Sequence, residues 1–138
     1  MADPPIRILL VEDNPGDARI LRELLREARS FYFELTHVER LAAAREHIRT
    51  EGADVVLLDL SLPDAHGLDT VRGMLEAAPE APIIVLTGLD DDATALHAVQ
   101  AGAQDFLVKG DVDAAVLARS VRYARERKRL ELERVHLL

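Results

Sequence analysis

The chain has 138 residues, of which 49% are hydrophobic and 30% charged, and its formal net charge is −8. This length and composition are typical of one globular domain that buries its own core, and they exclude a disordered chain. The absence of cysteine excludes a disulfide framework, a thiolate metal site and a cysteine nucleophile.

The first half of the chain alternates apolar runs with helical patterns. Residues 6–11 form a short run of branched apolar residues, which predicts a strand. Residues 14–28 begin with Asn-Pro, a helix cap followed by proline at the first helical position, and continue at helical spacing. Residues 33–38 alternate apolar and polar side chains as a strand does, residues 41–48 have helical spacing, and residues 54–59 predict a buried strand that ends in an acid.

The second half of the chain repeats this alternation after a loop that contains Pro63 and Gly67. The predicted elements are a helix through Leu75, a strand at 83–86, a helix capped by Asp90 to Asp92, a strand at 104–108 and a helix from Asp113 to the end. Parallel neighbouring strands need crossover connections, which helices usually provide. Five βα units in this order therefore predict a parallel sheet with helices on both faces.

Charged and polar side chains stand at the predicted carboxyl ends of four strands. They are Glu12 and Asp13 after the first strand, Asp59 after the third, Thr87 after the fourth and Lys109 after the fifth. Functional residues of an open α/β sheet gather at this edge. Three carboxylates that meet there would repel one another without a cation, and Mg²⁺ is a hard ion that oxygen ligands suit. The lysine and the hydroxyl can hold a phosphoryl group, and an aspartate can be the nucleophile that forms an aspartyl phosphate.

Four stretches, in the correct order and spacing, resemble the receiver domain of two-component response regulators. They are LLVEDNPGD at 9–17, VVLLDLSLPDAHGLD at 55–69, PIIVLTG at 82–88 and AGAQDFLVKG at 101–110. The resemblance implies the doubly wound, flavodoxin-like α/β fold of CheY, with five parallel strands in the order 2-1-3-4-5, over residues 1–125. It also implies a His-to-Asp phosphorelay that uses Mg²⁺ as cofactor.

The resemblance assigns the phosphoacceptor and the metal ligands to named residues. Asp59 matches the aspartate that is phosphorylated. Glu12 and Asp13 match the acidic pair that binds Mg²⁺ together with Asp59, and the backbone carbonyl of Ser61 matches the remaining protein ligand.

The resemblance also assigns a switch. Lys109 matches the lysine that pairs with the phosphoryl oxygens, Thr87 the hydroxyl that moves toward them, and Phe106 the aromatic residue that swings inward. The output face would be formed by the fourth helix, the fifth strand and the last helix. Gly110 departs from the family, which usually has proline after the lysine and a cis bond before it. Because a non-proline cis bond costs about 2.5–4 kcal/mol, we expect this bond to be trans.

The resemblance implies a sensor histidine kinase or a histidine phosphotransfer protein as the partner that donates phosphate. It implies no enzyme in the usual sense, because a receiver catalyses only its own phosphotransfer and dephosphorylation. Two alternatives stay open: a degenerate receiver that binds partners without phosphorylation, and an aspartate-nucleophile phosphatase. The strand-end residues disfavour the first. Ser61 disfavours the second, because haloacid-dehalogenase-type phosphatases have an aspartate at that position.

The last predicted helix runs past the expected end of the domain. Residues 119–134 carry a net charge of +4, against −12 for the remainder of the chain. Leu117, Val121 and Ala124 can face the sheet, whereas Leu130, Leu132, Val135 and Leu137 lie beyond it. We interpret residues 126–138 as a coiled-coil connector that forms a homodimer or leads into a C-terminal output domain. An exposed helix end is the alternative.

Composition and charge also bear on location. The apolar runs are far shorter than the roughly 20 residues that span a bilayer, and residues 1–5 lack the pattern of a secretion signal. An acidic chain is a poor nonspecific ligand for nucleic acid. We therefore expect a cytoplasmic protein that contacts neither a membrane nor nucleic acid directly.

Overall fold

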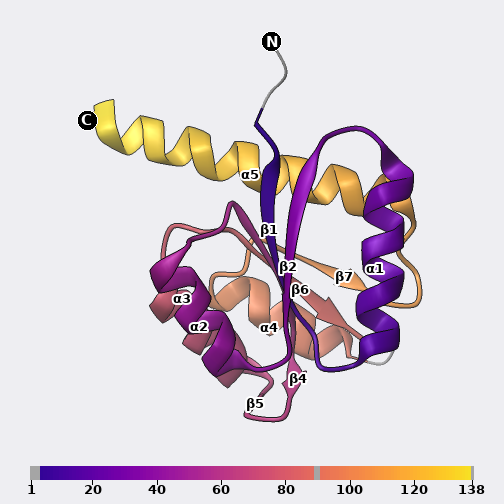
Figure 1. Ribbon diagram of the computed structural model, residues 1–138. Coiled ribbons are helices and arrows are strands. Elements are labelled where there is room, and N and C mark those ends of the chain that lie inside the picture. Colours follow the sequence, from indigo (N-terminus) through magenta and orange to yellow (C-terminus); the bar gives the residue numbers. More distant parts are fainter. Residues whose placement is uncertain (1–3, 89–90, 138) are drawn as a thin grey trace.

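The computed structural model describes residues 4–88 and 91–137, and its centre is a five-stranded parallel sheet (Figure 1). The strands lie in the order β2-β1-β3-β6-β7, which confirms the predicted order because β6 and β7 are the fourth and fifth strands of this sheet. Their bounds are β1 (Ile6–Val11), β2 (Phe33–Val38), β3 (Val55–Asp59), β6 (Ile83–Thr87) and β7 (Asp105–Val108).

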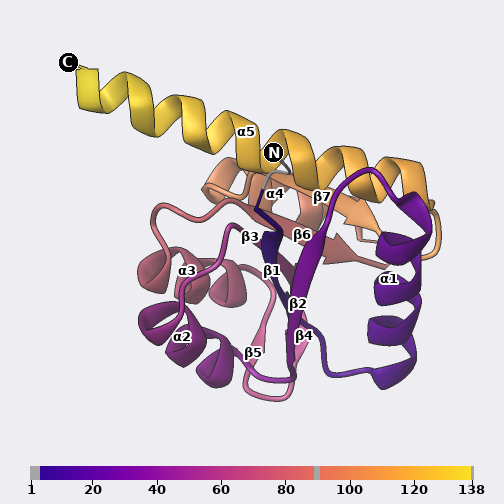
Figure 2. The same cartoon turned by 45° about the horizontal axis from the view of Figure 1, so that its top comes forward.

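Helices cover both faces of the sheet (Figure 2). Their bounds are α1 (Pro15–Ala28), α2 (Leu41–Thr50), α3 (Leu68–Ala77), α4 (Asp92–Ala101) and α5 (Ala114–Leu137). On β1, Ile8 and Leu10 pack in the cluster that includes α1 and α5, whereas Leu9 and Val11 pack in the cluster that includes α2, α3 and α4. Both faces of the central strands are therefore buried, which explains their nearly continuous apolar runs.

The start of α1 follows the chemistry of its sequence. The side chain of Asn14 accepts a hydrogen bond from the backbone N–H of Asp17 at 3.0 Å, and Pro15 occupies the first helical position. Both features were predicted. At α4 the expectation is wrong for Asp91, which precedes the helix but makes no capping side-chain hydrogen bond, while Asp90 lies outside the described residues.

The predicted loop after β3 is more ordered than its sequence indicates. It contains a hairpin of two short antiparallel strands, β4 (Ser61–Leu62) and β5 (Ala65–His66). Strands of two residues are too short for a hydrophobic period to be read. Gly67 follows with a positive φ of 58°, which glycine adopts without strain, and turns the chain into α3.

The hairpin supplies the cap of a different helix. The residue before α2, Arg40, makes no side-chain capping hydrogen bond. Instead the Asp64 carboxylate accepts hydrogen bonds from the backbone N–H groups of Leu41 and Ala42, at 2.9 and 3.0 Å. Burial alone raises the pKa of Asp64, but these N–H groups outweigh it and hold the pKa below its usual value. Asp64 thus joins the loop after β3 to the start of α2.

We expect Asp64→Ala to lower the free energy of unfolding by about 1 kcal/mol at neutral pH, the typical effect of losing a helix cap. The charge on Asp64 contributes stability above its unfolded pKa, and that contribution is lost as the pH falls through the lower folded pKa. The difference between variant and wild type therefore shrinks in acid. Urea unfolding at several pH values measures it. Asp111→Ala, at an exposed loop position whose side chain makes no hydrogen bond among the described residues, is the control. A constant difference at every pH would contradict the capping role.

The last helix is long, as predicted. Leu117, Val121 and Ala124 are buried against the sheet, while Leu130 and Leu132 are 54% and 42% exposed. The side chains of Val135 and Leu137 lie outside the described residues.

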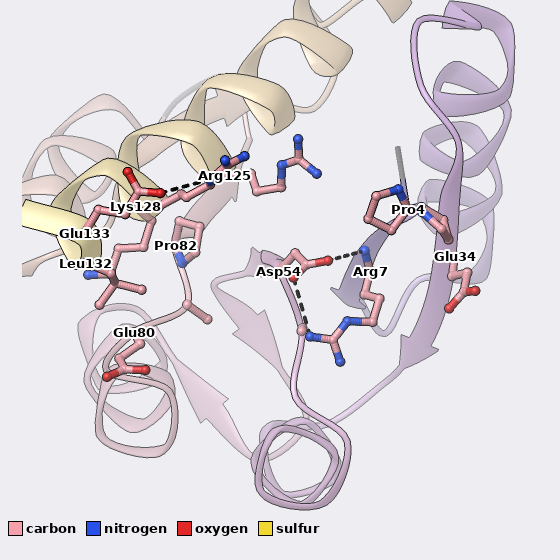
Figure 3. Close-up of a pocket in the computed structure, with 14 residues that line it drawn as sticks. Pro4, Arg7, Glu34, Asp54, Glu80, Pro82, Arg125, Lys128, Leu132 and Glu133 are labelled. Carbon is pink, nitrogen blue, oxygen red and sulfur yellow. Dashed lines mark hydrogen bonds and ion pairs between the residues drawn. The ribbon is translucent and has the colours of Figure 1, made fainter. Parts of the chain in front are cut away.

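In Figure 3, α5 passes a groove at the amino ends of the strands, where Leu132 faces Pro82 and the Arg7–Asp54 ion pair lies below. No helix within 4–88 and 91–137 combines the length and hydropathy needed to cross a membrane.

Candidate functional site

The predicted strand-end residues meet in one open cleft. The residues lining it include Glu12, Asp13, Asp59, Ser61, Thr87 and Lys109. They converge because parallel strands place all their carboxyl ends at the same edge of the sheet. Phe106, the predicted switch residue, lies outside the cleft on β7 and is 37% exposed.

Three carboxylates form the acidic part of the cleft. Oxygen atoms of Glu12, Asp13 and Asp59 lie within 4.8 Å of one another. Glu12 is fully buried and Asp59 is nearly so, whereas Asp13 is exposed. The Ser61 backbone N–H donates to Asp59 Oδ1 at 3.3 Å, which orients the Asp59 carboxylate. A set of close oxygen donors of this kind suits a small divalent cation such as Mg²⁺.

The ionisation of Glu12 supports the fit of a cation. Its Oε1 accepts a hydrogen bond from the Asn14 backbone N–H at 3.1 Å. Its Oε2 is buried and accepts no well-oriented hydrogen bond, and among the described residues only the Lys109 ammonium, 2.6 Å away, balances it. Burial raises the pKa of Glu12 to about 7 in spite of these contacts. A bound cation would therefore stabilise the charged form of Glu12.

Lys109 is the cationic part of the cleft. Its Nζ lies 2.6 Å from Glu12 Oε2, 3.2 Å from Asp17 Oδ2 and 3.3 Å from Asp59 Oδ2. Burial by itself lowers the pKa of Lys109, but the close contact with the Glu12 carboxylate and the charge of Asp59 outweigh burial and raise the pKa above its ordinary value. Lys109 is thus a permanent cation. The Lys109–Gly110 bond is trans, as are the other peptide bonds of the described chain.

Two residues that contact the predicted site residues were not themselves predicted. Asp17, one turn into α1, pairs with Lys109. His37, at the end of β2, donates from Nε2 to the backbone carbonyl of Glu12 at 2.7 Å. Asp17 could have been found, because the Asn14 cap starts α1 at the functional edge and places the first turn there. His37 carries no such signal, since its contact is to backbone.

The Thr87 hydroxyl is hydrogen-bonded to the neighbouring strand, although Thr87 lines the cleft. Its hydroxyl is buried and donates to the backbone carbonyl of Leu107 on β7 at 3.4 Å. The backbone carbonyl of Thr87 accepts from the Lys109 N–H at 2.9 Å, which fixes the start of the lysine loop. Thr87 therefore lies between the cleft and the strand that carries Phe106.

Comparison with known proteins decides the family. The family model described as the response regulator receiver domain matches residues 8–122. The chain belongs to the response regulator receiver domain family. This match begins within β1, covers the other four strands completely and confirms the resemblance noted in the sequence.

Relatives of this receiver domain are bacterial regulators. Over 116 residues it is 35% identical to the photosynthetic apparatus regulatory protein RegA of Rhodobacter capsulatus, covering 81% of this chain and 61% of RegA. Over 104 residues it is 36% identical to the swarming motility regulation protein RssB of Serratia marcescens, covering 75% and 46% of the two chains. The chain thus spans about three fifths of the one protein and about half of the other.

Solved structures agree with the fold. A response regulator receiver domain protein from Clostridium thermocellum superposes with a TM-score of 0.77 at 27% identity, covering 91% of this chain and 98% of the other. The receiver domain of a sensor histidine kinase from Pseudomonas aeruginosa gives a TM-score of 0.75 at 28% identity, with 89% and 99% coverage. That structure holds a magnesium ion in its active site cleft.

Proposed function

We propose that this receiver domain is phosphorylated on Asp59 in a Mg²⁺-dependent His-to-Asp phosphorelay. The observation that carries the proposal is the position of the Asp59 carboxylate. It lies 3.3 Å from the Lys109 ammonium and is grouped with the carboxylates of Glu12 and Asp13. A nucleophile between a cation and a set of metal ligands is suited to accept a phosphoryl group.

The phosphotransfer follows from the positions of the side chains. A carboxylate oxygen of Asp59 attacks the phosphorus of a phosphohistidine on a sensor kinase or a histidine phosphotransfer protein. The new O–P bond forms as the P–N bond breaks, and the imidazole nitrogen of the donor retains the electron pair. Lys109 neutralises the charge on the transferred oxygens, and Ser61 holds Asp59 in orientation. Attack of water on the phosphorus later releases phosphate and restores Asp59.

Glu12, Asp13, Asp59 and the backbone carbonyl of Ser61 would hold Mg²⁺. The bound ion supplies positive charge that offsets the repulsion between the carboxylates and the incoming phosphoryl group. The domain acts only on itself in this scheme, so we do not propose an enzyme that turns over a separate substrate. We also propose that the protein is located in the cytoplasm. Fractionation of the native cells would test this location.

The phosphoryl group would change the output face through Thr87. It would draw the Thr87 hydroxyl away from the Leu107 carbonyl and toward the cleft. The space near β7 then accepts Phe106, whose ring is partly exposed before phosphorylation. The affected face is formed by α4, β7 and α5. The distance from Thr87 to the phosphoryl oxygens in a structure of the beryllofluoride-bound domain tests this step, and an unmoved hydroxyl would contradict it.

The extension of α5 supports a role in assembly. Leu130 and Leu132 expose apolar surface beyond the part of α5 that packs on the sheet, and we propose that residues 126–138 form a homodimer or connect to an output domain. Sedimentation of the chain at high concentration, with and without beryllofluoride, should show a dimer that Leu130→Glu weakens. A monomer under both conditions would contradict dimerisation through this helix.

Incubation with acetyl phosphate and Mg²⁺ tests the main proposal. The chain should gain one phosphoryl group by intact mass, gain none in EDTA, and gain none as the Asp59→Ala variant. Labelling of Asp59→Ala to the wild-type level would exclude Asp59 as the acceptor. Labelling in EDTA at the wild-type rate would exclude the metal requirement.

A further inference from the structure

A second hollow lies at the end of the sheet opposite the acidic cleft. It has a volume of about 870 Å³ and is bordered by the start of β1, the end of α1, the segment leading into β2 and the middle of α5. Figure 2 shows α5 passing over this end of the molecule, beside the arch that joins α1 to β2. None of the residues of the acidic cleft lines it.

The hollow is strongly basic. Arg26 and Arg29 line it from the end of α1, Arg122 and Arg125 line it from α5, and no acidic side chain is among its lining residues. Arg26 pairs with Glu23 at 3.0 Å. Among the described residues, the other three arginines make no ion pair. Four clustered positive charges on a chain of net charge −8 repel one another, and an anion would relieve that repulsion.

Helix ends explain only two of these arginines. Arg26 and Arg29 lie at the carboxyl end of α1, where a positive charge complements the helix dipole. Arg122 and Arg125 lie in the middle of α5, so the dipole gives no reason for their positions. The Nε of Arg125 is moreover buried and has no hydrogen-bond acceptor among the described residues. A buried donor without an acceptor lowers stability until an acceptor arrives.

The other side of the hollow is apolar and aromatic. Leu25 is buried beneath it, and the rings of Phe31 and Phe33 meet edge to face at 6.2 Å against the core. The neighbouring ring of Tyr32 is 76% exposed, although it belongs to the same lining. A site that combines a guanidinium rim with aromatic rings suits a ligand that has both an anionic group and a planar ring.

We propose that this hollow binds a nucleotide. Guanidinium groups bind phosphate oxygens in pairs, and both arginine planes and an exposed tyrosine ring stack on a base. The volume falls within the range of about 300–1,000 Å³ that small-ligand sites occupy. The net charge of −8 on the whole chain disfavours a nucleic acid polymer, which would contact more of the surface than this hollow. The site is separate from the phosphorylated one, so a bound nucleotide would be a second input to the receiver.

Calorimetric titration of the full chain with ADP in EDTA tests the proposal. EDTA removes divalent cations, so no metal ion in the acidic cleft can hold the phosphates, and the arginine variants then distinguish the basic hollow from the other basic residues of α5. We expect Arg122→Gln to weaken ADP binding by at least about tenfold, as loss of a charge-assisted phosphate contact does. The matched control is Arg119→Gln, which removes the same charge one turn earlier on α5 at an exposed residue outside the hollow. We expect Tyr32→Leu to weaken ADP binding severalfold without weakening pyrophosphate binding.

Three results would overturn the proposal. Absence of ADP binding to the wild-type chain would exclude a nucleotide site, and binding of an acidic aromatic peptide in its place would make the hollow a peptide-docking surface. Equal weakening by Arg119→Gln and Arg122→Gln would show that only the general charge of α5 matters. If pyrophosphate bound as tightly as ADP, the base of the nucleotide would contribute nothing to binding, and the hollow would be a site for phosphate groups alone.

Discussion

Replacing Lys109 with methionine is expected to slow phosphorylation of Asp59 by acetyl phosphate about a hundredfold, and at the same time to strengthen Mg²⁺ binding severalfold. The loss of rate follows because the ammonium 3.3 Å from Asp59 is the side-chain cation of the cleft that can neutralise the transferred oxygens. The gain in metal affinity follows because the same ammonium competes with Mg²⁺ for Glu12 and Asp59. Methionine keeps the apolar stem of lysine and removes its charge.

The initial rate of mass gain measures the first effect, and calorimetric titration with MgCl₂ measures the second. Lys128→Met is the matched control, because Lys128 is the other lysine of the chain and pairs with Glu131 on α5, far from the cleft in sequence and on another element. It should change neither quantity. Weaker Mg²⁺ binding in Lys109→Met, or an unchanged rate of phosphorylation, would contradict the role given to Lys109.

Asp13→Asn should raise the free energy of unfolding without metal and reduce the stability that the chain gains from Mg²⁺. In EDTA we expect the free energy of unfolding to rise by about 1 kcal/mol, because the exposed Asp13 carboxylate no longer repels those of Glu12 and Asp59 at a few ångströms. With excess Mg²⁺ the variant should gain much less stability than wild type, since we expect its metal affinity to fall at least about tenfold. Stabilisation by a ligand depends on the ratio of its concentration to Kd.

Urea unfolding in EDTA and in MgCl₂ measures both parts of this prediction. Asp111→Asn removes an equal charge outside the lining of the cleft and should respond to Mg²⁺ as wild type does. A variant that is destabilised in EDTA, or that keeps the full wild-type response to Mg²⁺, would show that Asp13 is no metal ligand.

The sequence predicted the sheet and the convergence of the site for a simple reason. Central parallel strands are buried on both faces, so their apolar runs stand out, and their carboxyl ends share one edge. Glu12, Asp59 and Lys109 could therefore be placed together from their positions alone. The strand order rested on the family resemblance, because periodicity does not say which strands are neighbours.

Contacts between distant side chains and backbone could not be predicted in the same way. Asp64 caps α2 from a hairpin whose strands have two residues each, and a cap supplied from 22 or more residues away leaves no local pattern. The pairing of Asp17 with Lys109 joins residues 92 positions apart. Arg125 was seen only as part of a basic segment, because its neighbours Arg26 and Arg29 come from another helix.

The position of the phosphoryl group tests the central claim most directly. The chain would be phosphorylated with acetyl phosphate and Mg²⁺, reduced with borohydride to convert the acyl phosphate into a stable alcohol, digested, and sequenced by mass spectrometry. The account predicts conversion of Asp59 to homoserine and of no other residue. Modification of Asp13 or Asp17 with Asp59 intact, or no modification in protein that binds Mg²⁺, would contradict it.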